Sequence, residues 1–258
     1  MSPLELWVVR AGLVPYEEAR LVQKELEAAR LEDRIPDLLL LLQHPPVYTK
    51  GRRSSPEELP MGEEWYRMQG IEVADTDRGG RVTYHGPGQL VGYPIVSLGP
   101  YGDDVHDYIR RMERVVMSAL ADWGVTADVI DGLTGVWVPG GRATAKFAEA
   151  GLPASEAKKI GSIGVHINRG VTTHGFAINV NNDLQPFEWI VPCGLEACRM
   201  TSLSRELGAE QDLDAFADSV RERFARTYER EAAEIDAREL IERVPGAEAL
   251  AGARAALR

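Results

Sequence analysis

The 258-residue chain is predicted to form an α+β protein built on one main sheet. Strand-like segments recur along most of its length, whereas only two or three clear helical patterns occur, and they lie far apart in the sequence. Many strands with a few separated helices favour the α+β class. There is no internal repeat, and a hydrophobic content of 44% is sufficient for a sizeable core.

The predicted helices are marked by their ends as well as by apolar spacing. Pro15 suits the first position of one helix, and Asp103 or Asp104 can cap a longer helix that Gly124 ends. A third helical pattern follows Asp212. The apolar residues of the three segments recur at helical spacing: Ala19, Val22, Leu26 and Ala29; Val105, Tyr108, Met112, Val115, Ala119 and Trp123; Phe216, Val220, Phe224 and Tyr228.

The predicted strands differ in how deeply they should be buried. The continuous apolar run 38–42 predicts a strand covered on both faces. Pro94 interrupts the run 90–98 and predicts an edge strand or a bulge, because proline has no N–H to donate. Further strands are expected over residues 4–9, 71–74, 81–85, 136–138, 160–167 and 176–180.

The domain prediction is one functional domain with an appendage. We expect residues 1–230 to form the catalytic domain and residues 231–258 to form a C-terminal extension that is helical or partly disordered, because the apolar pattern weakens beyond Arg230. Residues 139–158 include Gly140-Gly141 and an alanine-rich stretch, which predicts a long mobile loop.

The composition excludes several classes of function. With a net charge of −11 and a pI near 5.0, general binding to nucleic acid or to an anionic membrane is not expected. Residues 50–53, Lys-Gly-Arg-Arg, are the best local basic patch. The sequence contains no apolar run of membrane-spanning length, and residues 1–10 lack an export pattern, so we expect a cytoplasmic protein. Two cysteines predict neither a disulfide framework nor a structural metal site.

Residues 78–89, Arg-Gly-Gly-Arg-Val-Thr-Tyr-His-Gly-Pro-Gly-Gln, carry the strongest local signal for a binding site. Their four glycines permit backbone conformations closed to other residues and allow a ligand to approach the main chain. Residues 81–85 alternate like a short strand, with Val82 and Tyr84 on its apolar side. The segment therefore predicts a turn, a strand and a second turn, although a glycine-rich hairpin without a ligand would give the same pattern.

Cys193 is the candidate nucleophile. It lies between Pro192 and Gly194, which places it on a turn, where a thiolate can carry an acyl group as a thioester. Burial as a small apolar residue is the alternative. A nucleophilic cysteine needs a base or a cation nearby, and spacing alone does not choose among His85, His174 and Lys159. The remaining histidines are His44, His106 on a helix surface and His166 on a strand, and the other lysines considered are Lys146 and Lys158.

Together these segments resemble the lipoyl(octanoyl) transferase family, whose members transfer octanoyl from acyl carrier protein to lipoyl domains. The resemblance covers roughly residues 5–205, and ordered motifs are far more specific than any one of them alone. The motifs are His44-Pro-Pro-Val-Tyr48 with Gly51-Arg52, residues 77–89, Lys159-Ile-Gly-Ser-Ile-Gly164, Thr173-His-Gly-Phe-Ala177 with Asn179, and Pro192-Cys-Gly194.

The resemblance implies a biotin/lipoate protein ligase-like fold: a single domain with a mixed, largely antiparallel main sheet flanked by helices. It also implies that Cys193 is the acyl-thioester nucleophile and Lys159 its partner. No cofactor or metal is expected, because exchange of a thioester for an amide runs downhill. The implied acyl pocket consists of Arg78, Gly79, Gly80, Arg81, Val82, Thr83, Tyr84, His85, Ser162, Ile163, Gly164, Gly175, Phe176 and Ala177.

The implied partners are acyl carrier protein as the octanoyl donor, and as acceptors the lipoyl domains of 2-oxoacid dehydrogenase complexes and the glycine cleavage H protein. Both kinds of partner are usually acidic, so docking requires a local basic surface, for which Arg52 and Arg53 are the candidates. Three alternatives stay open: an ATP-dependent lipoate–protein ligase, a non-catalytic lipoyl-domain binder, and a thioesterase or amidase that uses Cys193 with His174.

Overall fold

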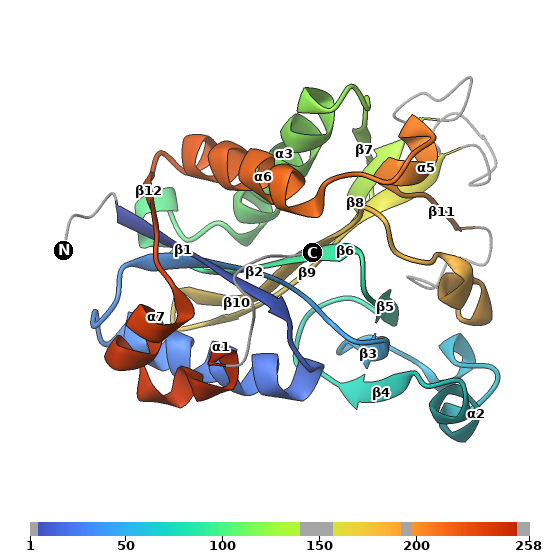
Figure 1. The fold of residues 1–258 in the computed structure, drawn as a ribbon, viewed down its shortest axis with the longest axis horizontal. Coiled ribbons are helices and arrows are strands. Elements are labelled where there is room, and N and C mark those ends of the chain that lie inside the picture. Colours follow the sequence, from blue (N-terminus) through green and yellow to red (C-terminus); the bar gives the residue numbers. More distant parts are fainter. Residues whose placement is uncertain (1–4, 140–156, 192–197, 252–258) are drawn as a thin grey trace.

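In the computed structural model, the described part of the chain comprises residues 5–139, 157–191 and 198–251. These residues form one large mixed sheet with helices on both faces, and a second, smaller sheet lies to one side (Figure 1). Among the described helices, none is long and apolar enough to cross a membrane.

The main sheet has nine strands. Strand β1 pairs in parallel with β2 and with β12, and β11 pairs in parallel with β9, whereas the remaining neighbours are antiparallel. The predicted mixed, largely antiparallel sheet is therefore confirmed. Along the sheet the order is β12 (Glu231–Glu234), β1 (Glu5–Leu13), β2 (Asp37–Gln43), β6 (Gln89–Ile95), β10 (Val171–Asn179), β9 (Lys158–Asn168), β8 (Leu133–Val138) and β7 (Asp128–Ile130), with β11 (Arg199–Met200) beside β9.

Strands β2, β6 and β10 occupy the centre of the sheet, and all of their residues are buried. The prediction that the run 38–42 is covered on both faces is confirmed. The expectation that Pro94 marks an edge strand is wrong, because β6 lies between β2 and β10. The ladder of β6 with β10 stops at the pair Gly92–Phe176, and beyond it the N–H of His174 donates to Gln23 Oε1 at 2.7 Å. This interruption accommodates a proline within the sheet.

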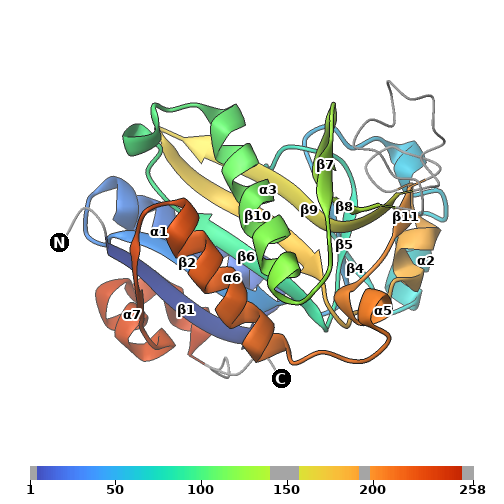
Figure 2. The ribbon, with the colours of Figure 1, turned by 90° about the horizontal axis from the view of Figure 1, so that it is seen from above.

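Two helices cover each face of the main sheet (Figures 1 and 2). Helices α3 (Val105–Asp122) and α6 (Leu213–Thr227) pack on one face, and α1 (Tyr16–Leu31) and α7 (Ala237–Arg243) pack on the other. Asp104 caps α3, accepting from the N–H groups of His106 and Asp107. The predicted apolar stripes of α1 and α6 are buried, and so is that of α3 except for its two end residues.

A smaller three-stranded sheet holds the glycine-rich segment in place. Strand β3 (Val47–Lys50) lies between β4 (Glu72–Asp75) and β5 (Thr83–His85). Helix α2 (Glu63–Met68) packs beside it, and Tyr48 contacts the rings of Tyr66 and Tyr84 at centroid distances of 4.9 and 5.6 Å. The remaining short elements are α5 (Leu203–Leu207) and 3-10 turns at Pro56–Glu58, Gly99–Tyr101, Gln185–Trp189 and Pro245–Leu250.

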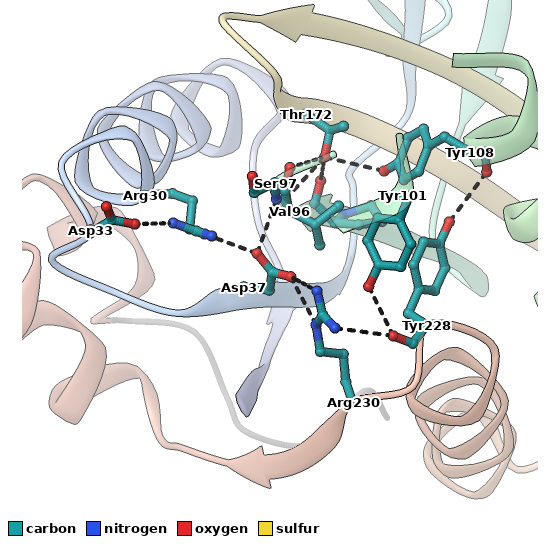
Figure 3. Close-up of polar contacts among 11 residues, drawn as sticks. Arg30, Asp33, Asp37, Val96, Ser97, Tyr101, Tyr108, Thr172, Tyr228 and Arg230 are labelled. Carbon is teal, nitrogen blue, oxygen red and sulfur yellow. Dashed lines mark hydrogen bonds and ion pairs between the residues drawn. The ribbon is translucent and has the colours of Figure 1, made fainter. Parts of the chain in front are cut away.

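The chain beyond residue 230 joins the same core. Strand β12 extends the main sheet, and α7 packs with the 3-10 turn 245–250 over β1 and α1. Figure 3 shows the buried carboxylate of Asp37 at this junction, where it accepts from Arg30 (2.9 Å), Arg230 (3.0 Å) and the N–H of Ser97 (3.0 Å). The Arg230 guanidinium also lies 5.1 Å from the centre of the Tyr101 ring.

Candidate active site

A cavity of about 470 Å³ lies where the glycine-rich segment approaches strands β8, β9 and β10. It is lined by residues 78–83, 85, 162–164 and 175–177 and by Lys159, so the structure brings most of the predicted site residues to one place. Tyr84 is not in the lining: it alternates with its neighbours on β5 and packs against Phe187 instead. Cys193 lies outside the described residues.

Two of the sequence motifs interlock at the rim of this cavity. The N–H groups of Arg52 and Arg53 donate to the carbonyls of Arg78 and Gly80, each at 3.0 Å. A side chain at position 51 would come within 2.6 Å of the Gly80 carbonyl, so this close approach requires glycine. The N–H of Gly79 in turn donates to Val165 on β9 at 2.9 Å, which fixes the segment against the main sheet.

The two arginines of the glycine-rich segment are both engaged by the protein. Arg78 is buried, and its guanidinium donates to the carbonyl and hydroxyl oxygens of Thr49 at 2.6 and 2.7 Å. Arg81 pairs with the buried carboxylate of Glu58 (2.5 Å), which also accepts from the N–H of Val82 (3.0 Å). These contacts hold the segment's shape from both sides.

A neutral histidine, His85, lies in the floor of the cavity, and a second, His44, packs against it with the ring centres 5.6 Å apart. Burial lowers the pKa of His44 to about 4, so its Nδ1–H donates to Val14 (2.7 Å) and its Nε2 accepts from the Tyr93 hydroxyl (2.7 Å). Burial also lowers the pKa of His85 well below its usual value, and its Nδ1 bonds Gln89 Oε1 at 2.7 Å. The floor therefore carries no imidazolium charge near neutral pH.

His174 is held in a conformation that is unusual for a side-chain-bearing residue. Its φ is +58°, and its Nε2 lies 2.7 Å from Asp77 Oδ1. Burial lowers the pKa of His174 despite the opposing effect of Asp77, and the hydrogen bond from His174 lowers the pKa of that carboxyl. Of the other histidines considered, His106 is exposed and His166 is half-buried, as predicted.

Lys159 is buried at the other end of the cavity wall, with only 3% of its surface exposed. Its Nζ donates to the carbonyl of Thr134 (3.1 Å) and lies 5.2 Å from the centre of the Trp137 ring. This position is unusual, because most lysines at strand ends are solvated. Glu113, on helix α3, is buried nearby, and its carboxylate accepts from the N–H of Gly135 at 3.1 Å. Burial raises the pKa of this carboxyl.

The sheet register separates two of the candidate partners for the nucleophile. His174 pairs with Val165 on β9, six residues beyond Lys159, which corresponds to roughly 20 Å along a strand. The described chain on either side of residues 192–197 contacts the site: the N–H of Val191 donates to Glu58, and residue 199 pairs with Lys158 on β9. Lys159 thus pairs with the described chain that follows this segment, at Met200, whereas His174 lies farther along the strands.

Sequence reasoning missed Tyr16, Tyr93, Glu113 and Trp137 at this site. Tyr16 and Tyr93 line the cavity as ordinary core aromatics, and nothing local marked them. Glu113 did carry a signal, since it lies four residues after Ile109 and three before Val116 and therefore faces inward on α3.

Comparison with known proteins identifies the family. The model of the lipoyl protein ligase A/B catalytic domain matches residues 15–225. The octanoyltransferase of Acidothermus cellulolyticus is 49% identical over 197 residues, which span 76% of this chain and 80% of that protein. This chain belongs to the octanoyltransferase family. Its members are acyltransferases, and the predicted family and enzyme class are confirmed.

The share of each relative that the match covers varies. The octanoyltransferase of Myxococcus xanthus is 42% identical over 224 residues, and the match spans 87% of this chain but only 60% of that protein. Among solved structures, the bipartite lipoate protein ligase of Thermoplasma acidophilum has a TM-score of 0.67 at 18% identity and covers 96% of this chain and 89% of that one. That likeness confirms the predicted lipoate/biotin protein ligase-like fold.

Proposed function

We propose that this protein transfers an octanoyl group from octanoyl-acyl carrier protein to a lysine of lipoyl domains, through a thioester on Cys193. The observation that carries the proposal is the buried Lys159 at the wall of a cavity whose other walls are the family's glycine-rich segment and β10. The acceptors would be the lipoyl domains of 2-oxoacid dehydrogenase complexes and the glycine cleavage H protein.

The first half-reaction forms the acyl-enzyme. The Lys159 ammonium stabilises the Cys193 thiolate by charge proximity and so lowers the pKa of that thiol. The thiolate attacks the carbonyl carbon of the donor thioester, and the bond from that carbon to the carrier sulfur breaks. The carrier sulfur leaves with the proton held on Lys159, so the octanoyl group rests on Cys193 and the Lys159 amine is neutral.

The second half-reaction reverses the proton's path. The acceptor lysine must attack as a free amine, and the neutral Lys159 takes the proton that this amine loses on forming the amide bond. The bond from the carbonyl carbon to the Cys193 sulfur breaks, which restores the thiolate beside the Lys159 ammonium. No nucleotide is consumed, because an amide is more stable than a thioester.

The cavity walls suit a straight, uncharged acyl chain. Glycines 79, 80, 164 and 175 bring the main chain itself to the surface of the cavity, and a side chain at Gly175 would collide with the Gly92 carbonyl at 2.3 Å. The buried imidazole of His85 in the lining, and that of His44 packed against it, are neutral. Aliphatic and aromatic side chains, including Val91, Phe176 and Ala177, complete the lining.

The proposal is tested by product formation without ATP. Purified protein, octanoyl-acyl carrier protein and a lipoyl domain should give a domain heavier by one octanoyl group on its lysine. Cys193→Ala serves as the control and should give none. Modification that requires ATP and octanoate, and that survives in Cys193→Ala, would instead support a ligase. Release of octanoate without modified domain would support a thioesterase.

A further inference from the structure

The pairing of β8 with β9 is irregular beside Lys159, because one extra residue, Ile160, is inserted on β9. The β8–β9 ladder shifts by one residue between the pairs Val136–Gly161 and Trp137–Lys159. The Thr134 carbonyl accepts from Lys159 Nζ, and the Trp137 ring lies against the same group. We call residues 134–137 the lysine cradle. A bulge of this kind bends the strand that carries it and re-aims a side chain there, here that of Lys159.

Gly135 is the position at which the lysine cradle depends on backbone geometry. Its φ is +125°, which favours glycine, and a Cβ there would come within 2.6 Å of both the Gly161 carbonyl and Lys159 Cε. The main chain at residue 135 therefore packs directly on the lysine side chain. Any displacement of this residue moves the surface that Lys159 rests on.

A single side chain from α3 fixes this residue. Glu113 is 8% exposed and accepts from the N–H of Gly135 at 3.1 Å. It interrupts an otherwise apolar helix face, between Met112 and the buried pair Val115–Val116. Burying a carboxylate there opposes folding, which is seen in the raised pKa of the Glu113 carboxyl. An apolar residue could be buried here at a lower cost in folding free energy. We therefore attribute the presence of the carboxylate to its hydrogen bond with Gly135.

We infer that Glu113 is a positioning residue: it holds Gly135 so that the lysine cradle keeps Lys159 directed at the reacting sulfur. The inference rests on the proposed function, because it assigns a role to Glu113 only through Lys159. Glu113 itself is not among the residues that line the cavity. Misplacing a reacting group by about 1 Å can cost on the order of 100-fold in rate.

The test compares a polar and an apolar replacement at one position. Glu113→Gln keeps an oxygen that accepts from Gly135, whereas Glu113→Met and Glu113→Leu keep bulk without an acceptor. With an octanoyl thioester of a small thiol, we expect acylation of Glu113→Gln within about threefold of wild type and that of the apolar variants slower by about 10- to 100-fold at unchanged KM. Ala119→Gly, elsewhere on α3, is the control for lost helix stability and should acylate normally.

A double-mutant cycle separates positioning from general damage. If Glu113 acts through Lys159, Glu113→Met should slow the residual acylation of Lys159→Ala no further. An equal loss in both backgrounds, a raised KM at unchanged kcat, or a Glu113→Gln rate as low as that of the apolar variants would overturn the inference and leave the proposed function intact. Failure of the wild type to acquire any octanoyl group would overturn both.

Discussion

At the scale of single residues, Lys159 shows how a cation can be held at an apolar wall. A buried charge is costly unless polar groups surround it, and here a carbonyl and an aromatic face do so, with the carboxylate of Glu113 nearby. The sequence alone left Lys159, His85 and His174 equivalent as candidates. Only the resemblance to the family singled out Lys159. The strand register separates it from His174, which pairs with Val165, six residues beyond Lys159 on β9.

Replacing Lys159 should slow both half-reactions. We expect Lys159→Ala to lower the rate constant for acylation and the rate constant for transfer to the lipoyl domain, each by on the order of 100-fold or more. Rapid-quench measurement of the acyl-enzyme separates the two steps. Lys159→Arg, which keeps the charge but is a poor base, should recover more of the first step than of the second. A normal acylation burst in Lys159→Ala would contradict the dual role.

At the scale of elements, patterns with a period were predictable and long-range pairings were not. The apolar stripes of α1, α3 and α6 specified those helices, and the run 38–42 specified a buried strand. Pro94 was misleading because the sequence does not reveal that the ladder is interrupted opposite it, where the N–H of His174 donates to Gln23. The partnership of β12 with β1 joins residues more than two hundred positions apart, and no local signal in Glu231–Glu234 indicates it.

The junction at Asp37 should dominate the stability of the C-terminal elements. Asp37 and Arg230 are 4% and 6% exposed at their side chains, and removal of one partner from such a pair typically costs about 3–5 kcal/mol. We expect Arg230→Leu to lower the free energy of unfolding by roughly that amount in urea titrations. Arg238→Leu, at an exposed site on α7, is the control and should change it little. Equal midpoints of urea unfolding for Arg230→Leu and Arg238→Leu would contradict this role.

At the scale of the whole molecule, buried neutral histidines make stability depend on pH. The pKa of His44 falls from 6.5 unfolded to about 4 folded, so below pH 6.5 the unfolded chain binds a proton that the folded chain does not. Stability should therefore fall as the pH drops from about 6.5 to about 4, by up to ~3 kcal/mol from this residue. Urea titrations at intervals across this range should show a shallower fall in His44→Gln. An identical pH dependence in that variant would refute the assignment.

The acidic molecule needs a local basic surface for acidic partners. Arg52 and Arg53 are exposed beside the cavity, and their N–H groups are tied to the glycine-rich segment. Reversal of both to glutamate should raise the apparent KM for acyl carrier protein by about tenfold and leave small octanoyl thioesters unaffected. Arg238→Glu, on the α7 side, is the matched control. A similar change with both kinds of donor would exclude docking at this surface.

The central claim is that Cys193 carries the octanoyl group, and the intact mass of the protein tests it most directly. After mixing with octanoyl-acyl carrier protein alone, the wild type should gain the mass of one octanoyl group, located on Cys193, removed by neutral hydroxylamine and discharged by added lipoyl domain. Cys193→Ala should gain nothing. Octanoylated lipoyl domain formed at the normal rate by Cys193→Ala would contradict the account.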